Sequence, residues 1–397
     1  MTTPGNGWPA IAFESRSWQR SGDEVASRRQ LRRITSDYPA AVPPLIGRAA
    51  VELEPEVITA ADEASQALAR FDEAAGRFIA PFSAILLRTE SASSSEVENL
   101  TAGAKQVALA GIGASRSENA RLVMANTRAM EAALRLSNQL DEEAVIAMHD
   151  ALLSESAPHI VGRWRQEQVW IGGGPASPHG AQFVPPHHDR VPELMSDLLD
   201  FADRDDVPIL AQAAIAHAQF ETIHPFPDGN GRTGRALIHA MLRRGGLTQN
   251  VTVPVSAGLL HDPRGYFDAL TDYREGDVDA IVHAITNATF AAIGNGSRLV
   301  REIGDAREGW SHRVRARSDA AVHRLMDTLL AQPVVTAKSA SQALGISEVA
   351  AHAAVNRLVD AGVLSQAAGG ARYRVWQAHD VIMALDDFAA RARRGRV

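Results

Sequence analysis

Apolar residues recur three or four positions apart over most of the chain, and this spacing predicts a mainly helical protein. The pattern is clearest over residues 54–87, 100–155, 191–201 and 278–293. Two more helices are predicted over 208–223 and 233–244, and the second of them stops at two glycines. The segment that joins them is rich in proline and glycine, so we expect a tight loop between two helices.

Two stretches in the first half of the chain depart from the helical pattern. Residues 163–171 and 181–184 favour two short strands joined by a loop of glycine and proline. Residues 1–45 show little periodicity and predict an extended arm lying on the folded body. A disordered tail is an equal alternative for the first fifteen of them.

The chain changes character after Pro333. The pattern predicts a strand, two helices separated by a glycine turn, and a final hairpin, over 334–336, 337–344, 347–361, 363–366 and 372–376. This order resembles a winged helix. Its second helix would expose mostly alanines with His352 and Arg357, whereas DNA readers usually present more Arg, Lys, Asn or Gln. We therefore favour a protein-contact or packing module, with weak DNA binding at most.

Composition narrows the class of protein. The 397 residues are 45% hydrophobic, which suffices for two or three domains. No apolar run approaches the roughly 18 residues of a membrane span, and the N-terminus lacks a signal-peptide pattern. There are no cysteines, so disulfides and thiolate metal sites are excluded and a cytoplasmic protein is expected. The formal net charge of −7 argues against bulk binding of nucleic acid.

The loop between the two central helices concentrates groups that handle phosphate. From His224 to Arg235 the sequence reads HPFPDGNGRTGR. Its prolines and glycines allow several backbone N–H groups to face one point at the start of the second helix, which is the geometry of an anion site. Arg232 and Arg235 add forked donors suited to phosphate. The order differs from the strand–loop–lysine phosphate loop of many nucleotide-binding proteins.

Two further side chains of this loop suit chemistry on a phosphate ester. Asp228 offers an oxygen ligand for Mg²⁺, which usually binds one carboxylate plus substrate phosphates. His224 can act as a base near neutral pH. The alternative is a turn with a capping aspartate and solvated arginines. The combination of all these features between two helices favours the phosphate site.

The same stretch resembles the signature of the Fic family, H-x-F-x-[D/E]-G-N-G-R-x-x-R. Its defined positions are matched by His224, Phe226, Asp228, Gly229, Asn230, Gly231, Arg232 and Arg235. The resemblance covers roughly residues 35–300. It implies a mainly α fold, with a Fic helical core and a small β-hairpin flap, followed by the C-terminal winged-helix domain. The expected segments are 1–150 (arm and helical region), 151–300 (core), 301–332 (linker helix) and 333–397.

The resemblance implies a protein adenylyltransferase, which transfers AMP from ATP to a hydroxyl side chain of a target protein. In this assignment His224 is the catalytic base and Asp228 holds Mg²⁺. The target would lie along the flap, residues 169–184. The residues implied to bind the nucleotide are Gly229, Asn230, Gly231, Arg232, Arg235 and Tyr266. For Tyr266 and its neighbour Tyr273, packing in the core is an equal alternative.

The serine cluster within residues 89–100 has two possible interpretations. Serines before acidic residues predict a helix N-cap with a capping carboxylate. The same residues resemble the inhibitory motif [S/T]-x-x-x-E-[G/N] of Fic proteins, whose helix lies across the nucleotide site. That resemblance implies inhibitory roles for Ser94, Glu98 and Asn99, with Glu98 paired to Arg235, and we favour it over the cap alone.

Two other functions stay open. A Fic site could transfer another phosphate-bearing group or remove AMP, although the second arginine suits a triphosphate and so favours AMP addition. Alternatively, the chain could be a transcription regulator whose nucleotide site only senses a ligand. The sequence also leaves open whether the chain forms a homo-oligomer.

Overall fold

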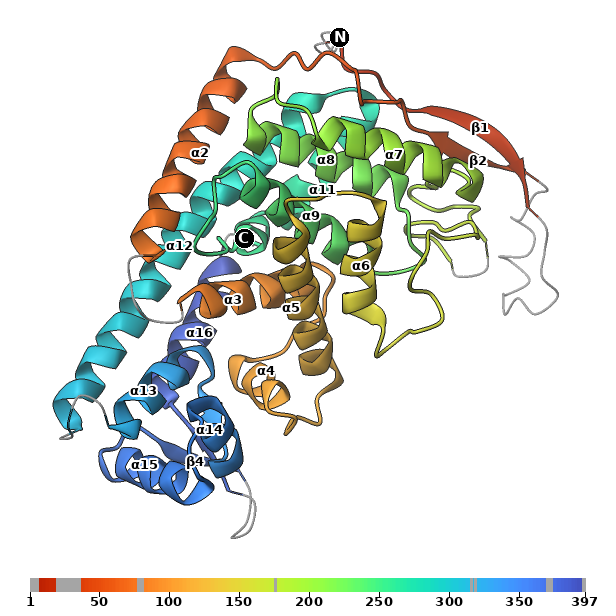
Figure 1. Ribbon diagram of the computed structural model, residues 1–397. Coiled ribbons are helices and arrows are strands. Elements are labelled where there is room, and N and C mark those ends of the chain that lie inside the picture. Colours follow the sequence, from red (N-terminus) through yellow and green to blue (C-terminus); the bar gives the residue numbers. More distant parts are fainter. Residues whose placement is uncertain are drawn as a thin grey trace. The chain divides into compact units, whose positions relative to one another are not determined.

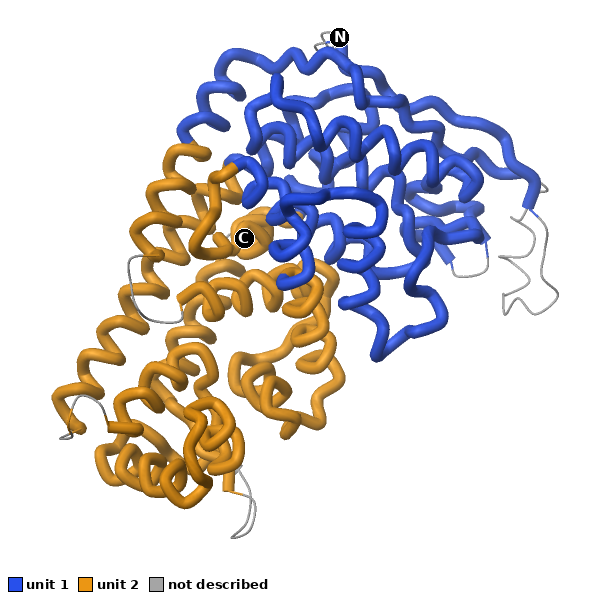
Figure 2. The backbone as a smooth tube through the Cα atoms, in the orientation of Figure 1, with its two compact units in different colours: residues 1–63, 131–245, 264–286 blue, residues 64–130, 246–263, 287–397 orange. Residues whose placement is uncertain are grey.

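The structure is a computed structural model that describes residues 7–18, 37–76, 82–174, 177–314, 317, 320–368 and 374–394. The chain divides into two compact units (Figure 2). Unit 1 comprises Met1–Glu63, Glu131–Gly245 and Arg264–Thr286. Unit 2 comprises Ala64–Met130, Gly246–Pro263 and Asn287–Val397. Among the described residues, no helix is long and apolar enough to cross a bilayer.

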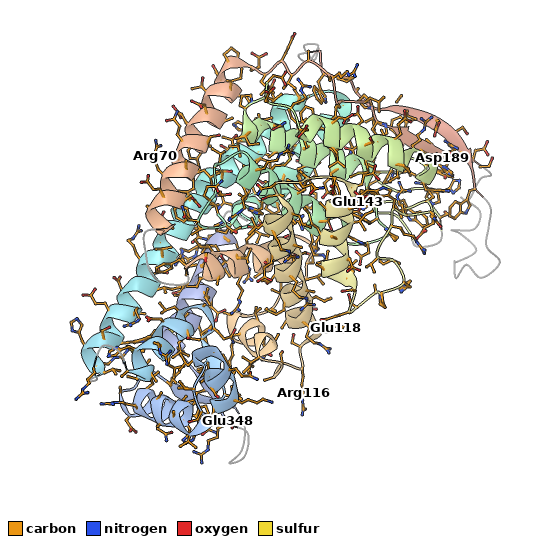
Figure 3. The ribbon with its side chains drawn as sticks, viewed as in Figure 1. Arg70, Arg116, Glu118, Glu143, Asp189 and Glu348 are labelled. Atoms are coloured by element: carbon orange, nitrogen blue, oxygen red, sulfur yellow. The ribbon has the colours of Figure 1, made fainter. Side chains whose placement is uncertain are left out.

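The described elements are mostly helices, as the apolar spacing predicts (Figure 1). The helices are α2 Pro55–Gly76, α3 Phe82–Val97, α4 Ala104–Gly111, α5 Glu118–Leu136, α6 Glu142–Leu153, α7 Val191–Ala202, α8 Ile209–Ile223, α9 Asn230–Arg244, α10 Val255–Leu259, α11 Pro263–Glu275, α12 Val278–Arg313, α13 Ala321–Ala331, α14 Ala337–Leu344, α15 Glu348–Asp360 and α16 His379–Ala392, with a short 3-10 helix at His188–Arg190. Charged side chains such as Arg70 on α2 and Glu348 on α15 lie on exposed faces (Figure 3).

Helices α8 and α9 form the centre of unit 1 and pack directly against each other. Every residue of α8 from Leu210 to Ile223 is buried, so its apolar side chains contact neighbours on all sides. The two helices approach most closely at Gly234 of α9. A Cβ atom built there would lie 2.9 Å from the ring of Phe220 and 3.1 Å from His217. A larger residue at that position would force these buried side chains of α8 to move.

The N-terminal residues form the extended arm that the sequence predicts, as far as they are described. Strands β1, Ala12–Ser17, and β2, Asp37–Val42, pair antiparallel. The backbone N–H of Ala41 donates to the carbonyl oxygen of Val184, which attaches the arm to the body of unit 1. Residues 1–6, part of the alternative disordered tail, lie outside the described residues.

The prediction of two strands over 163–171 and 181–184 is wrong for most of their length. Their described part contains a single bridge, between Ile171 and Phe183, whose backbones exchange hydrogen bonds of 2.8 and 3.2 Å. Prolines 185 and 186 lack an N–H group to extend this ladder. The side chain of Gln168 instead bonds the carbonyl oxygen of Pro185, at 2.9 Å. The flap is therefore a loop closed by one bridge, with residues 175–176 outside the description.

The C-terminal elements of unit 2 follow the predicted order of helices and strands. Strands β3 Val334–Val335, β4 Ser365–Ala368 and β5 Val375–Gln377 form one sheet in the order β3–β5–β4. The side chain of Ser347 accepts from Ala350 N–H, so this serine caps α15. Gly345 ends α14 with a φ of 64°. Residue Arg372, the predicted start of the last strand, lies outside the described residues.

A buried carboxylate on α2 organises a neighbouring loop of unit 2. The Asp72 side chain, on a residue only 4% exposed, accepts from the backbone N–H groups of Gln249, Asn250 and Val251. The Asn250 side chain donates to it as well, at 2.8 Å. Among these donors, the N–H of Val251 is buried and would lack a partner without the carboxylate.

Asp72→Ala is therefore expected to lower the free energy of unfolding by about 2 to 3 kcal/mol, because four donors, including the buried N–H of Val251, lose a charged acceptor. Urea unfolding followed by circular dichroism measures the loss. The matched control is Glu73→Ala, since Glu73 is the exposed neighbour on the same helix and should change stability by about 0.5 kcal/mol or less. Equal effects of the two substitutions would contradict the role given to Asp72.

Candidate active site

The loop between α8 and α9 is bounded by two residues with left-handed backbones. His224 caps the C-terminus of α8 with φ 53° and ψ 60°, and Gly229 precedes α9 with φ 80°. Helix α9 begins at Asn230, three residues before the predicted start at Thr233. Asn230, Gly231 and Arg232 therefore belong to its first turn. The first N–H groups of a helix have no partner within the helix, so this end suits an anion.

The inner part of the loop is fixed by side chains. Asn230 bonds Phe226 twice: its Oδ1 accepts from the backbone N–H of Phe226 and its Nδ2 donates to the carbonyl oxygen, both at 2.8 Å. The ring of Phe226 is fully buried and stacks on His149 of α6, with 3.7 Å between ring centroids. His149 Nε2 lies 3.0 Å from the carbonyl oxygen of Asp228. Burial lowers the pKa of His149, which favours the neutral ring.

His224 retains access to solvent while its backbone is held. Its side chain is 20% exposed, and its backbone N–H donates to Phe220 at 2.8 Å. The nearly buried carboxylate of Glu221 lies 3.8 Å from His224 Nδ1. A carboxylate on that side of an imidazole favours the tautomer whose Nε2 can accept a proton. Arg165 Nε donates to the carbonyl oxygen of His224 at 2.8 Å.

Asp228 presents an exposed carboxylate at the start of α9. Its side chain is 67% exposed, its Oδ1 accepts from Gly229 N–H at 2.6 Å, and Arg232 lies 3.7 Å away. The described residues contain no group of three or more His, Asp or Glu side chains able to enclose a metal ion. Mg²⁺ bound together with phosphates needs one or two carboxylates, so Asp228 fits an ion carried by a polyphosphate rather than a protein cage.

The two arginines of the motif are buried, Arg232 at 5% and Arg235 at 2% exposure. Arg235 lies close enough to His217 to affect its titration: burial, followed by the charge of Arg235, lowers the pKa of His217 to about 3. The neutral His217 ring lies 2.8 Å from the Tyr266 hydroxyl through its Nε2. His217 and His239 are both buried.

Tyr266 and Tyr273 are both 2% exposed. Tyr266 contacts His217, and the Tyr273 hydroxyl donates to Gln219 at 2.9 Å. These contacts match the packing alternative that the sequence left open for both residues. An adenine contact by Tyr266 stays a prediction.

The serine cluster lies at the end of a helix, so its interpretation as an N-cap is wrong. Helix α3 starts at Phe82, well before the serines, and ends at Val97. Ser91 and Ser95 donate to carbonyl oxygens four residues earlier, at 2.8 and 2.9 Å. Serine hydroxyls can bond in this way inside a helix, which removes the need for a capping position.

Helix α3 is fixed within unit 2 by buried polar contacts. Asn126 Nδ2 of α5 donates to the carbonyl oxygen of Ser91 at 2.9 Å. Ser94 is fully buried, whereas Glu98 and Asn99 follow the helix in exposed positions, and Asn99 ends it with a φ of 62°. Glu98 belongs to unit 2 and Arg235 to unit 1. The pairing of these two residues therefore stays a prediction.

Comparison with known proteins agrees with this geometry. Residues 139–242, which include His149, Arg165, the whole loop and all but the last two residues of α9, match the Fic/DOC family profile. This segment belongs to the Fic/DOC family. This chain is 30% identical over 176 residues to the protein adenylyltransferase fic-1 of Caenorhabditis elegans. It is 32% identical over 124 residues to the probable protein adenylyltransferase aq_aa38 of Aquifex aeolicus.

These matches cover limited parts of the Fic/DOC relatives. The worm alignment spans 41% of this chain and 32% of the relative, and the Aquifex alignment spans 29% and 36%. A crystal structure of a Fic family protein from Desulfovibrio desulfuricans G20 superposes with a TM-score of 0.52, covering 83% of this chain and 97% of that one. At 23% identity, that likeness shows the fold alone.

Three residues around the site lie outside the motif. Arg165 and Glu221 contact His224, and His149 stacks on Phe226. Glu221 could have been found from its spacing, because a residue three positions before His224 on a helix lies on the same face. Arg165 and His149 are 59 and 79 residues from their partners, the backbone oxygens of His224 and Asp228, so local patterns carry no signal for them.

Proposed function

We propose that the protein is an adenylyltransferase that moves AMP from ATP to a hydroxyl side chain of a target protein. One observation carries the proposal: an accessible histidine, an exposed carboxylate and the first turn of a helix meet within the six-residue loop 224–229 and its junction with α9. A base, an oxygen ligand and an anion site are the three parts that nucleotidyl transfer from a triphosphate requires.

The chain's residues divide this work. His224 accepts the proton of the attacking hydroxyl as oxygen bonds to the α-phosphorus and pyrophosphate leaves. The N–H groups of Gly229, Asn230 and Gly231 take up charge on the phosphates. Arg232 contacts the β-phosphate region and Arg235 the γ-phosphate, and both are forked donors held by burial. Mg²⁺, when bound, neutralises phosphate charge beside Asp228.

The target protein is proposed to lie along the flap, residues 169–184. At the bridge between Ile171 and Phe183, the backbone of the flap is extended over a short segment. Backbone groups of such a segment can pair with an extended peptide. AMP addition is favoured over AMP removal because Arg235 provides a site for a third phosphate.

Mass spectrometry of the purified protein after incubation with each of the four common nucleoside triphosphates and Mg²⁺ tests this proposal. The expected product is a covalent increase of one AMP, formed from ATP. An increase of one phosphate, or modification by a different nucleotide in preference to ATP, would point to the alternative transfer reaction. No covalent change, together with specific DNA binding, would favour a nucleotide-sensing regulator.

The C-terminal segment of unit 2 is proposed to be a winged helix that contacts protein. The order α13–β3–α14–α15–β4–β5 supports this identity. Helix α15 presents Val349, which is 82% exposed, and Arg357 is exposed on the same helix. A helix with an exposed apolar residue and few basic side chains is better suited to contact a protein surface than the phosphate backbone of DNA.

DNA binding by the full chain is expected to be non-specific, with a Kd no tighter than about 10⁻⁴ to 10⁻⁶ M at physiological salt. A gel-shift titration with the upstream DNA of its own gene measures this affinity, and a scrambled duplex of equal length is the control. A sequence-selective complex at nanomolar protein that survives added salt would contradict the expectation.

A further inference from the structure

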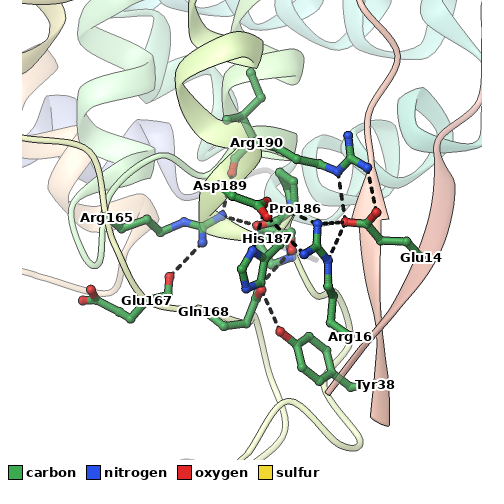
Figure 4. A network of polar contacts seen from close by, with 12 residues as sticks. Glu14, Arg16, Tyr38, Arg165, Glu167, Gln168, Pro186, His187, Asp189 and Arg190 are labelled. Carbon is green, nitrogen blue, oxygen red and sulfur yellow. Dashed lines mark hydrogen bonds and ion pairs between the residues drawn. The ribbon is translucent and has the colours of Figure 1, made fainter. Parts of the chain in front are cut away.

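Arg165 is a buried arginine whose hydrogen bonds go to backbone carbonyl oxygens. The residue is 3% exposed. Its Nη1 donates to Glu167 at 2.8 Å and its Nη2 to Pro186 at 2.5 Å, and Figure 4 shows the guanidinium between these two segments. Its Nε donates to His224 at 2.8 Å. One side chain thus joins the segment that enters the flap, the segment that leaves it and the proposed catalytic residue.

The backbone of Arg165 adds a second attachment to the same loop. Its N–H donates to the carbonyl oxygen of Pro225 at 2.9 Å, so Arg165 holds two consecutive carbonyl groups, those of His224 and Pro225. Nη2 also lies 3.4 Å from the carbonyl oxygen of Ile223. These contacts surround the one residue of the loop that adopts a left-handed backbone without being glycine.

That backbone conformation needs external support. His224 has a φ of 53°, which residues with a Cβ adopt rarely. Such conformations persist where surrounding contacts hold them. The orientation of the carbonyl group of His224 fixes its ψ angle, and the direction of the Cα–Cβ bond follows from φ and ψ. A donor on this carbonyl therefore helps to determine where the imidazole points.

The guanidinium suits this task better than any other side chain. Burial lowers the pKa of Arg165 to about 10, which leaves it charged at neutral pH. Charged donors form stronger hydrogen bonds to carbonyl oxygens than neutral ones. The planar fork also reaches several acceptors in fixed directions, which the single ammonium of lysine does not.

We propose that Arg165 is a positioning residue that holds His224 in its left-handed conformation and ties it to both ends of the flap. This inference rests on the proposed function in so far as His224 is the base and the flap receives the target. Within the loop, the acceptors of Arg165 are the carbonyl oxygens of His224 and Pro225, which precede Asp228, whereas the proposed phosphate donors follow it. Loss of Arg165 should therefore affect the transfer step and spare the binding of ATP.

The test compares Arg165→Met and Arg165→Lys with Arg163→Met. Arg163 is an exposed arginine two residues earlier in the same segment, which makes it a matched control. Single-turnover AMP transfer by Arg165→Met is expected to be about 100-fold slower, since a displacement of about 1 Å costs this much. Arg165→Lys should lie between it and the wild type. ATP affinity should change less than about 3-fold, because Arg165 contacts none of the groups proposed to bind the phosphates.

A second readout does not depend on catalysis. The His224 imidazole signal is identified in proton NMR spectra by its loss in His224→Ala, and it is then titrated in each variant. In Arg165→Met, the chemical shift of this signal and the pH at its titration midpoint should both differ from those of the wild type. In Arg163→Met, both should remain unchanged. If the wild-type protein transfers no AMP, the proposed function fails and this titration still decides the role of Arg165.

Two results would overturn the proposal. One is an unchanged His224 titration in a folded Arg165→Met protein. The other is a transfer rate equal to that of the wild type in either variant. If Arg165→Met does not fold, the same two measurements on Arg165→Lys give the answer.

Discussion

Replacing His224 with alanine is expected to lower AMP transfer by about 100- to 10,000-fold, the range that a general base contributes. The effect should fall on the transfer step alone. His224 ends α8, whereas the proposed phosphate donors are backbone groups of the first turn of α9 and the side chains of Arg232 and Arg235. ATP should therefore bind His224→Ala about as tightly as it binds the wild type.

Self-labelling with ATP and calorimetric titration of a non-hydrolysable ATP analogue measure the two quantities separately. His312→Ala is the control, because His312 is 77% exposed on α12 and its removal should leave both unchanged. Self-labelling by His224→Ala at the wild-type rate would contradict the assignment of His224 as the catalytic base. Loss of nucleotide binding together with labelling would show that His224 supports the loop rather than the reaction.

Glu98→Gly is expected to increase self-labelling. The Fic inhibitory motif, matched here by Ser94, Glu98 and Asn99, implies that this carboxylate pairs with Arg235. A single guanidinium cannot bind the carboxylate and the γ-phosphate in one geometry, and the two anions repel each other. ATP would then bind with its α-phosphate out of line, and removal of the carboxylate would restore a productive arrangement.

The structure makes the activity of this variant straightforward to interpret. Glu98 is exposed and lies just past the last residue of α3, so its replacement should change the free energy of unfolding by only about 0.5 kcal/mol. Glu98→Gln removes the charge without adding backbone freedom and should also raise labelling. Glu118→Gln is the matched control, an exposed glutamate of unit 2 at the start of α5.

The double variant Glu98→Gly/His224→Ala should be inactive, because release of an inhibitor cannot replace a base. Unchanged labelling by both Glu98 variants, in proteins of normal stability, would remove the inhibitory role and leave the catalytic assignment intact. Increased labelling by Glu118→Gln as well would point to a general effect of surface charge on the reaction.

The motif and its two flanking helices could be predicted from the sequence because their signals are local. Alanine-rich periodicity marks α8, and glycines and prolines mark the loop. The predicted start of α9 at Thr233 was late, because Asn230 and Gly231 are unusual residues for a helix. The structure places them in its first turn, where Asn230 bonds the loop through its side chain instead of interrupting the helix.

Tertiary contacts overrode local patterns at two other places. The sequence predicts a helix end at Ile293, because Gly294 and Gly296 follow, yet α12 continues to Arg313. At Gly296 the helix packs closely on Phe71, since a Cβ atom there would lie 3.3 Å from the ring. The serines of α3 are polar but buried, and their partner Asn126 lies 35 residues from Ser91. Such long-range partners leave no periodic trace.

The central claim is that the chain transfers AMP, and parallel reactions with α-labelled and γ-labelled ATP test it most directly. Purified protein and a cell lysate are incubated with each nucleotide and Mg²⁺, and labelled proteins are separated by electrophoresis. We expect bands from the α label alone, with the γ label recovered as pyrophosphate, and no bands with His224→Ala. Equivalent bands from the γ label, or α-label bands that persist with His224→Ala, would contradict AMP transfer by this site.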